Sequence, residues 1–505
     1  MAVKLGNGNW AVKEDKLLAY NDNSGLFFNK EFDFSRGTSA TYVAKDGLIK
    51  TAGIQPNVVS NGDFATDSDW TKGTGWTIAD GSASYDASGT SALTSASTSI
   101  VSGKIYRLKF KITTSGFARL NFTTDGSQSL FQPNGNSLNN FADGEYTFYL
   151  SAQNNSTALK IFAYNVSGGT SFLIDNVSVQ EIQTDTPRID FTNDTKGHLL
   201  LEPQSTNLIP YSEDFSQWSL LGGTAGTVTY VSDLVNPDGS VGGYKISNSG
   251  IFVGIGLPST AQRSIYARSV SGSGNAQLMS HNSNTNNVFT LTEEWQRFEL
   301  NSSPLVAGNF YVDLRGSETT LDEIYVWGAN ATNDQDYLTS YIPTTGAAST
   351  RNADVCNNSG SAQDFNSEEG VLYAEVASLA EDIGGSKNFS ISDGTNNNGV
   401  KFAFRTAGSQ IGVSVKSNGT TTANNVYNMP VSNFFKVAFK YKTNDCALWV
   451  NGTEIATDTS AAMPLDLSSL RFDRGDNGNK FNGKVRNLQV FTEALTDEQL
   501  QKLTS

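Results

Sequence analysis

The side chains that most often carry enzyme chemistry are scarce in this sequence of 505 residues, which has two histidines, His198 and His281, and two cysteines, Cys356 and Cys446. The histidines lie far apart among polar loop residues, so most of the chain lacks the commonest general base and metal ligand. No serine-hydrolase, zinc-protease or phosphate-loop motif is present. A glycosidase could use only carboxylates, and fifty acidic residues will form some suitably spaced pairs by chance. We therefore expect no enzyme activity.

Carbohydrate binding is a chemistry that the sequence does support. A sugar site needs an exposed aromatic face for the C–H surface of the ring, and amide, carboxylate or guanidinium groups for the hydroxyls. Candidates in the stretch 57–182 are Trp76, Phe117, Arg119, Asn121, Phe131 and Gln132. Candidates in the stretch 207–354 are Trp218, Tyr266, Arg268, His281 and Asn282. The alternative is that the tryptophans are core residues, which we favour for Trp70 and Trp218 and leave open for Trp76.

Short strands must position these side chains. Stretches such as 106–112 and 145–150 alternate apolar and polar residues between clusters of Gly, Asn, Asp and Ser, which is typical of half-buried strands. Helical periodicity is convincing only near the end, where 496–499 reads as a capping box and Leu495 and Leu500 are placed as a hydrophobic staple. We therefore predict an all-β protein with one short C-terminal helix.

An internal repeat divides the first part of the chain. NVVSNGDF at 57–64 returns as NLIPYSEDF at 207–215, and a tryptophan follows each copy. The closing strands LIDNVSV at 173–179 and TLDEIYV at 320–326 also match. The repeat predicts two modules of similar length, 57–182 and 207–354.

Each module resembles the jelly-roll carbohydrate-binding domains of the galactose-binding-like type, and the likeness is closer in the first copy. The resemblance implies tandem jelly-roll sandwiches. Related jelly rolls hold a structural calcium between the opening loop and the closing-strand aspartate, which corresponds to Asp63 with Asp175 and to Asp214 with Asp322. The alternative, to which we give more weight, is acidic turns capped without a metal.

Four strings resemble stretches of bacteriophage virion proteins, usually tail or head-fibre components. They are RGTSATYVAKDGLI at 36–49, PRIDF at 187–191, LLLEPQSTNL at 199–208 and SYIPTTGAASTRNAD at 340–354. The first two run almost directly together in those proteins, whereas about 130 residues intervene here. We therefore interpret 57–182 as a jelly roll inserted into an N-terminal connector and virion anchor, 1–56, which continues at 183–206.

The C-terminal part, 369–505, resembles a laminin-G or concanavalin-like sandwich and follows a polar linker at 355–368. The resemblance lies in GVLYAEV at 370–376, FKVAFKY at 435–441, ALWVNG at 447–452 and FNGKVRNLQVF at 481–491. Asn and Gly at 451–452 predict a type I′ hairpin turn. A further candidate cation site comprises Asp393, Asn396, Asp473 and Asp476.

Composition limits the possible partners. The net charge of −15 disfavours binding to nucleic acid or anionic membranes, and no apolar run is long enough for a membrane helix. The N-terminal residues lack the apolar core of a secretory signal, so we expect a protein made and assembled in the host bacterial cytoplasm. We expect the two cysteines to be buried thiols, with one disulfide as the alternative.

These observations lead to one functional hypothesis and two alternatives. We expect a fibre or decoration component of a bacteriophage virion that adheres to host-surface glycans and contacts other virion proteins, with a homotrimer favoured. The alternatives are a purely structural head or tail protein and a bacterial surface polysaccharide-binding protein. Residues 1–55 are too short to bury their own apolar side chains, so we expect them to be ordered only against other subunits or a virion partner.

Overall fold

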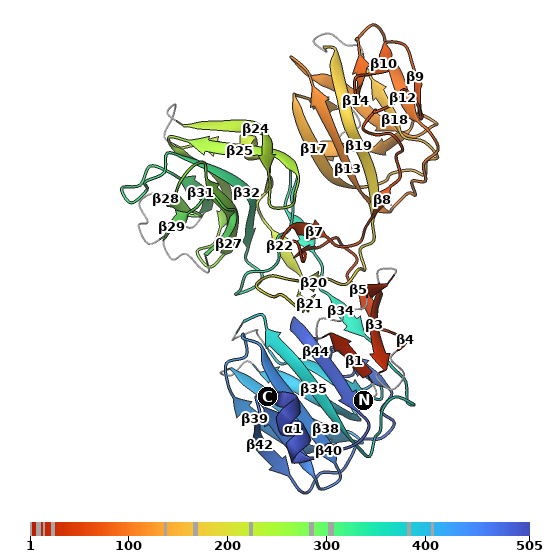
Figure 1. The fold of residues 1–505 in the computed structure, drawn as a ribbon, viewed down its shortest axis with the longest axis vertical. Coiled ribbons are helices and arrows are strands. Elements are labelled where there is room, and N and C mark those ends of the chain that lie inside the picture. The colour runs from red at the N-terminus through yellow and green to blue at the C-terminus, as the bar shows by residue number, and fades with distance from the viewer. Residues whose placement is uncertain are drawn as a thin grey trace.

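The computed structural model describes residues 3–6, 12–13, 16–21, 26–135, 139–164, 170–221, 226–281, 287–300, 308–380, 385–405 and 409–505, with only the backbone described before Phe32. Three β-sandwiches surround a central connector, and the labelled N and C ends both lie at the C-terminal sandwich (Figure 1). One α-helix, α1 (Asp497–Thr504), is present in these residues, and none of their helices is long and apolar enough to cross a membrane. The predicted all-β fold is confirmed.

The first sandwich packs two sheets around a core that includes the fully buried Leu108, Leu120 and Ile161. One sheet has the order β10 (Trp76–Ala79), β11 (Ser82–Tyr85), β19 (Phe172–Ile182), β13 (Ile105–Thr113) and β17 (Gly144–Ser151), with β8 (Ile54–Asn57) also on β19. The other has the order β15 (Ser129–Phe131), β14 (Ala118–Thr123), β18 (Lys160–Ala163), β12 (Ser91–Ser95) and β9 (Trp70–Lys72), with β16 (Asn139–Phe141) on β14. The chain leaves the connector and returns to it at one point, where the N–H of Gln183 donates to the carbonyl of Gly53 at 2.9 Å.

The second sandwich has two sheets of five strands each and its own core, in which Ile265, Phe310 and Ile324 are fully buried. One sheet has the order β23 (Ser219–Leu220), β26 (Gly250–Leu257), β31 (Gly308–Asp313), β28 (Gly274–Leu278) and β29 (Val288–Leu291). The other has the order β24 (Thr227–Val235), β25 (Val241–Ser247), β32 (Glu323–Thr332), β27 (Gln262–Ser269) and β30 (Gln296–Leu300).

The C-terminal sandwich also has two facing sheets. One contains β44 (Gly483–Phe491), β35 (Glu369–Ser378), β40 (Phe435–Lys442), β41 (Cys446–Val450) and β42 (Thr453–Asp458). The other has the order β39 (Thr420–Asn428), β38 (Gln410–Ser417), β37 (Gly399–Arg405), β36 (Lys387–Ser392) and β43 (Ser469–Arg471). The β41–β42 turn has positive φ at Asn451 (46°) and Gly452 (80°), as a type I′ turn requires.

Helix α1 packs against the first of these sheets (Figure 1) and begins as the sequence predicts. The Thr496 hydroxyl accepts from the N–H of Gln499, and the Gln499 side chain accepts from the N–H of Thr496, which completes the capping box. Leu495 and the fully buried Leu500 belong to one apolar cluster, as a hydrophobic staple requires.

The N-terminal strands lie on the chain's own C-terminal sandwich. Strand β1 (Val3–Gly6) pairs with β44, and β3 (Lys16–Asn21) pairs with β1, β2 (Val12–Lys13) and β4 (Leu26–Glu31). Phe32 is buried in the C-terminal core. The edge of β44 and the C-terminal core thus supply partners for the described part of residues 1–55, whereas we expected these partners from other subunits or the virion.

Short paired strands form the connector between the sandwiches. They are β5 (Asp33–Ser35) with β34 (Val355–Asn357), β6 (Thr41–Val43) with β7 (Ile49–Thr51), β20 (Ile189–Asp190) with β21 (His198–Leu201), and β22 (Ser205–Asn207) with β33 (Ser349–Arg351). The stretch 355–368, expected as a polar linker, begins within this pairing and buries Phe365 in the C-terminal core. Cys356 and Cys446 are buried free thiols, as we expected.

A buried ionic cluster, here called the hub, joins the connector strands. It consists of Arg36, Arg188, Glu202, Arg351 and Asp354, all from the strings that resemble virion proteins. Arg188 lies 2.7 Å from Glu202 and 2.5 Å from Asp354. Arg351 lies 2.8 Å from Glu202, and Arg36 lies 3.0 Å from Asp354. Burial alone would raise the pKa of Glu202, but Arg351 and Arg188 hold it at about 2, so the cluster stays ionised.

Candidate functional site

The open face of the β14–β18 sheet in the first sandwich brings two of the predicted sugar-binding residues together. Leu120 on β14 points into the core, so Arg119 and Asn121 lie on the opposite face by strand alternation. Asn121 is opposite Phe162 on β18, and the N–H of Tyr164 donates to the carbonyl of Arg119 at 3.0 Å. Side chains from β14 and β18 therefore share one surface.

This surface has the two components of a sugar site. The rings of Phe162 and Tyr164 are half-buried, with centroids 5.0 Å apart, and can cover the C–H face of a sugar. Asn121 is 7% exposed, and its Oδ1 has no hydrogen-bond partner in the described part of the chain. Arg119 makes no ion pair with a described carboxylate, and the exposed Asn140 of β16 lies opposite it. Amide and guanidinium groups of this kind can bind sugar hydroxyls.

Phe162 and Tyr164 were not among the residues predicted to bind sugar, although strand alternation could have indicated them. In the stretch 160–164, Ile161 and Ala163 are fully buried, so the aromatic residues between and after them occupy the other face. An aromatic residue on the non-core face of a strand is the signal that would have found this pair.

The stacking role expected of Trp76 is wrong. Its indole is 4% exposed and lies between Tyr85 and Phe172, with ring centroids at 5.2 and 5.7 Å. Phe131 is likewise fully buried, because it faces Tyr106 across the core.

Two remaining candidates from the first module lie at the ends of strands. Phe117, directly before β14, is half-buried, and its carbonyl accepts from the N–H of Thr170. Gln132, directly after β15, is also half-buried, and its carbonyl accepts from the N–H of Gly135.

Two tryptophans have the structural role that we favoured. Trp70 packs on Phe64 at 5.2 Å, and its indole N–H donates to the carbonyl of Asn61. In the second module, Trp218 packs on Phe215 at 5.0 Å and donates to the carbonyl of Tyr211. In both copies of the repeat, a buried tryptophan thus holds the opening loop in place. The sugar-binding role considered for Trp218 is therefore wrong.

Tyr266 and Arg268 of the second module share one sheet face but are engaged by neighbouring side chains. Tyr266 packs on Trp327, with ring centroids at 5.5 Å, in a cluster that faces the connector. The guanidinium of Arg268 lies 5.5 Å from the Trp295 ring and 4.6 Å from the Tyr325 ring. These contacts are cation–π interactions within the module.

The histidines also have structural partners. The His281 ring lies edge-on to Tyr311 at 5.3 Å, and its Nε2 lies 3.3 Å from Arg315, while Asn282 lies outside the described residues. His198, expected in a loop, is buried on β21, with its Nδ1 3.2 Å from Asp194.

The predicted calcium ligands are arranged differently in the two modules. In the first, Asp63 lies close enough to Asp175 to raise its pKa, although burial is the larger cause. In the second, Asp214 accepts from the Tyr244 hydroxyl at 2.7 Å and from the N–H of Ser216, which caps a short 3₁₀ turn. Asp322 is exposed. In the first pair, Asp63 accepts from the N–H of Ala65 at 3.4 Å and Asp175 accepts from the N–H of Asn176 at 2.6 Å, so these carboxylates also cap turns.

The acidic loops of the C-terminal sandwich satisfy their own hydrogen bonds. Asp393 accepts from Thr395 and Asn398, and Asp473 pairs with Arg471 at 3.1 Å. Asp476 pairs with Arg474 at 2.7 Å, and the Asn396 amide oxygen accepts from Lys401. Among the described residues, no group of three or more His, Cys, Asp or Glu side chains is placed to hold a metal ion.

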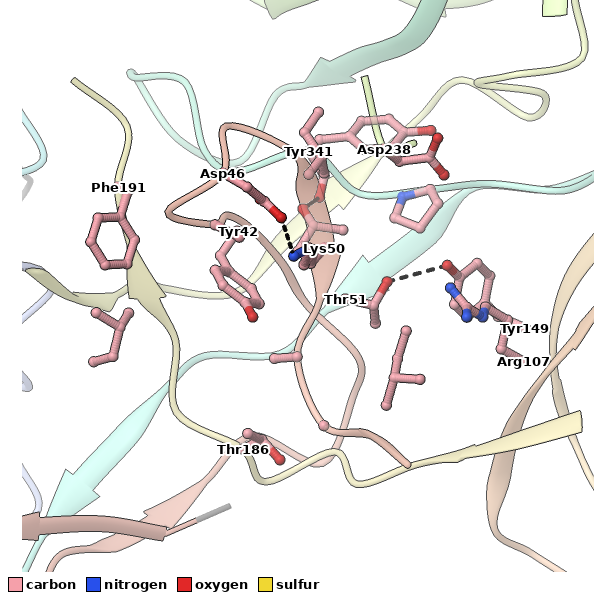
Figure 2. Close-up of a pocket in the computed structure, with 18 of the residues that line it drawn as sticks. Tyr42, Asp46, Lys50, Thr51, Arg107, Tyr149, Thr186, Phe191, Asp238 and Tyr341 are labelled. Carbon is pink, nitrogen blue, oxygen red and sulfur yellow. Dashed lines mark hydrogen bonds and ion pairs between the residues drawn. The ribbon is translucent and has the colours of Figure 1, made fainter. Parts of the chain in front are cut away.

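A cavity of about 990 Å³ lies where the connector meets the first and second sandwiches. Figure 2 shows side chains that line it, with the Asp46–Lys50 ion pair and the hydrogen bond between Thr51 and Tyr149 drawn as dashed lines. The labelled residues are Tyr42, Asp46, Lys50, Thr51, Arg107, Tyr149, Thr186, Phe191, Asp238 and Tyr341.

Glu213, also on the wall of this cavity, is a buried acid with a raised pKa. Burial, and then the neighbouring Asp238 carboxylate, raise the pKa of Glu213 to about 7. The Tyr341 hydroxyl donates to its Oε1 at 2.7 Å, and Asp238 accepts from the N–H of Ser240. Glu213 and Asp238 line one cavity, and glycosidases use two carboxyl groups as acid and base, so we test these residues for hydrolysis.

Comparison with known proteins identifies the C-terminal sandwich. Residues 380–501 match the family model Laminin_G_3, described as the concanavalin A-like lectin/glucanases superfamily. The C-terminal domain is therefore concanavalin A-like, as its sequence pattern predicts. No curated protein sequence matches the chain.

Several solved structures resemble parts of the chain. The CBM40 of the Ruminococcus gnavus IT-sialidase, bound to alpha2,3-sialyllactose, is 17% identical, with 30% of this chain and 94% of that chain covered and a TM-score of 0.23. The leech intramolecular trans-sialidase is 20% identical over 29% of this chain and 26% of its own, with a TM-score of 0.23. Domain 4 of the arabinanase AbnA from Geobacillus stearothermophilus is 14% identical over 30% and 73%, with a TM-score of 0.25.

Proposed function

We propose that this chain is a non-catalytic adhesion protein that binds carbohydrate, with one binding site on the open face of the first sandwich. The observation that carries the proposal is the half-buried Phe162–Tyr164 pair beside Arg119 and Asn121. It combines an apolar platform with a buried amide oxygen that has no partner among the described residues, which is the composition that a sugar ring requires.

The setting of this adhesion is a bacteriophage virion, in which the protein is a fibre or decoration component beside other virion proteins. The support is the likeness of the strings at 36–49, 187–191, 199–208 and 340–354 to those of virion proteins. These four strings contain the hub residues. The likeness to virion proteins therefore lies in the segments whose ion pairs hold the connector together. Display in several copies, with a homotrimer favoured, turns weak binding at each site into useful avidity.

The test measures retention and cleavage together. The full-length protein is applied to immobilised surface polysaccharide from candidate bacterial hosts, and retention and the release of reducing ends are followed in the same experiment. The binding variant is F162A/Y164A, and the matched control is Y427A, which removes an exposed aromatic ring from the C-terminal sandwich. A further variant, E213Q, removes the acid of the cavity.

The proposal predicts retention without released ends, weakened by F162A/Y164A and unchanged by Y427A. Released reducing ends that disappear in E213Q would contradict the non-catalytic function. Absence of retention on every host polysaccharide would contradict adhesion. Labelling of intact particles with antibodies against the purified protein tests the virion setting separately, and unlabelled particles would contradict it.

A further inference from the structure

The C-terminal sandwich has its own hollow on the open face of the β36–β39 sheet. This sandwich and the first sandwich, which contains β14 and β18, lie at opposite ends of the molecule (Figure 1). Phe402 and Phe404 on β37 are fully buried in the core, so Lys401, Ala403 and Arg405 lie on the opposite face. A cavity of about 700 Å³ lies over this face. We call it the basic groove.

Two small residues form the floor of the basic groove. Ala403 on β37 is opposite Gly412 on β38, so the surface between these strands is low. A Cβ added to Gly412 would lie 2.9 Å from Nε of Arg405, which shows that the arginine side chain lies across the glycine. The absence of a side chain at this position therefore makes room for the guanidinium.

Four half-buried cations surround the floor, namely Lys401, Arg405, Lys416 and Arg474. Arg474 alone among them pairs with a described carboxylate, that of Asp476. Lys401 donates to the Asn396 amide oxygen at 2.9 Å, and Arg405 donates to the Asn424 amide oxygen at 2.9 Å. Neutral amides cannot balance these charges. The chain as a whole carries −15, so this local excess of positive charge opposes the general trend of the molecule.

The cations also repel one another. Burial, and then the neighbouring Lys416 and Arg474, lower the pKa of Lys401 to about 8. Like charges held close together in a partly desolvated hollow cost stability unless a counter-charge joins them. A bound anion would supply that charge.

We propose that the basic groove binds an acidic polysaccharide through the carboxylate or sulfate groups on its sugars. The cations supply charge-assisted hydrogen bonds to the anionic groups. Amide and hydroxyl side chains on the same walls, including Asn388, Gln410, Ser414 and Thr421, supply partners for sugar hydroxyls.

A polysaccharide fits this lining better than a nucleic acid does. No aromatic side chain lines the groove in the part of the chain that the structure describes, so bases find no stacking platform there. The net charge of −15 acts against both kinds of polyanion, so the lining of the groove is what favours the polysaccharide. The site is independent of the Phe162–Tyr164 face, and it extends the proposed function from adhesion in general to acidic glycans.

The experiment measures binding of the full-length protein to polygalacturonate, dextran sulfate, neutral dextran and single-stranded DNA by biolayer interferometry. The groove variant is K401Q/K416Q. The matched control is K436Q/K442Q, which removes the same charge from β40 on the opposite sheet of the same sandwich. Melting temperatures of both variants show whether the fold is retained.

The proposal predicts binding to polygalacturonate or dextran sulfate that falls about tenfold or more in K401Q/K416Q and less than about twofold in the control. The polymer that binds identifies the anionic group. Equal losses in the two variants, or binding of DNA as tight as that of the acidic polysaccharide, would overturn the proposal, as would no binding to either acidic polymer. The F162A/Y164A variant keeps the basic groove intact. If it loses binding to neutral dextran, the comparison of K401Q/K416Q with its control on acidic polymers still stands, so the two sites are tested separately.

Discussion

The hub and the basic groove use the same types of side chain in opposite ways. The hub buries three arginines, and two carboxylates lie within 2.5 to 3.0 Å of their guanidinium groups. The groove leaves four cations half-buried, with one carboxylate between them. A buried charge is tolerated when an opposite charge lies beside it, and each charge of the hub has such a partner within the chain. The groove is incomplete, and this difference separates a structural cluster from a candidate binding site.

The largest predicted effect comes from breaking the hub. R188A removes the shared partner of Glu202 and Asp354 and leaves two buried carboxylates undercompensated. We expect the free energy of unfolding to fall by about 3–5 kcal/mol, measured by denaturant titration. K50Q, which removes an exposed ion pair, is the control and should cost less than about 1 kcal/mol. A loss in R188A no larger than that in K50Q would contradict the structural role of the hub.

Glu213 is a buried acid that, unlike Glu202 of the hub, makes no ion pair with an arginine among the described residues. The folded protein holds its proton up to about pH 7, whereas the unfolded chain releases it near pH 4.5. The contribution of protonated Glu213 to the free energy of unfolding is therefore complete below about pH 4.5. It is lost as the pH rises through about 7, which lowers the free energy of unfolding by about 1–3 kcal/mol. E213Q keeps an acceptor for Tyr341 and should flatten this loss, as measured by melting curves from pH 4 to 8. Parallel curves for the two proteins would refute the assignment.

The Asp63–Asp175 pair has the opposite charge to the groove, and Lys111, which lies opposite Asp175 in the sheet, opposes the rise in the pKa of Asp175 that burial causes. Calcium bound there only in the folded state would stabilise it by about 1.4 kcal/mol at a tenfold excess over Kd. Chelation should then lower the melting temperature of the wild-type protein, and D175N should remove the difference. D322N is the control, because Asp214 of that pair is engaged by Tyr244 and Ser216. An unchanged wild-type melt on chelation would exclude a stabilising calcium.

The smallest predicted effect on stability lies in the groove itself. K401Q removes a lysine whose neighbours repel it. The free energy of unfolding should therefore stay the same or rise by less than about 0.5 kcal/mol. R188A and K401Q each remove one cation, and the contrast between them isolates the contribution of partners. A loss in K401Q comparable to that in R188A would mean that the groove is a structural cluster as well.

Local patterns in the sequence predicted local structure well. The alternating stretches became strands, the Thr496 capping box formed, and the repeat correctly marked Trp70 and Trp218 as equivalent residues of two modules. Each of these features depends on residues close together in the chain or on a copied motif.

Features that need distant residues escaped prediction. The residues next to Trp76 in the sequence do not show whether its indole is buried. Its burial depends on packing against Tyr85 and Phe172. The hub joins four strings up to 318 residues apart, from Arg36 to Asp354. The basic groove joins separate strands whose lysines and arginines are each unremarkable alone. Sequence spacing carries no information on such contacts without the sheet order that creates them.

The central claim is that open sheet faces bind glycans while the hub only holds the sandwiches together. The most direct test is affinity electrophoresis of wild type, F162A/Y164A, K401Q/K416Q and K436Q/K442Q in gels that contain neutral or acidic host polysaccharide. We predict that F162A/Y164A loses retardation in the neutral gel, that K401Q/K416Q loses it in the acidic gel, and that K436Q/K442Q loses neither. Retardation that is absent for the wild type in both gels, or is unchanged in both binding-face variants, would contradict the claim.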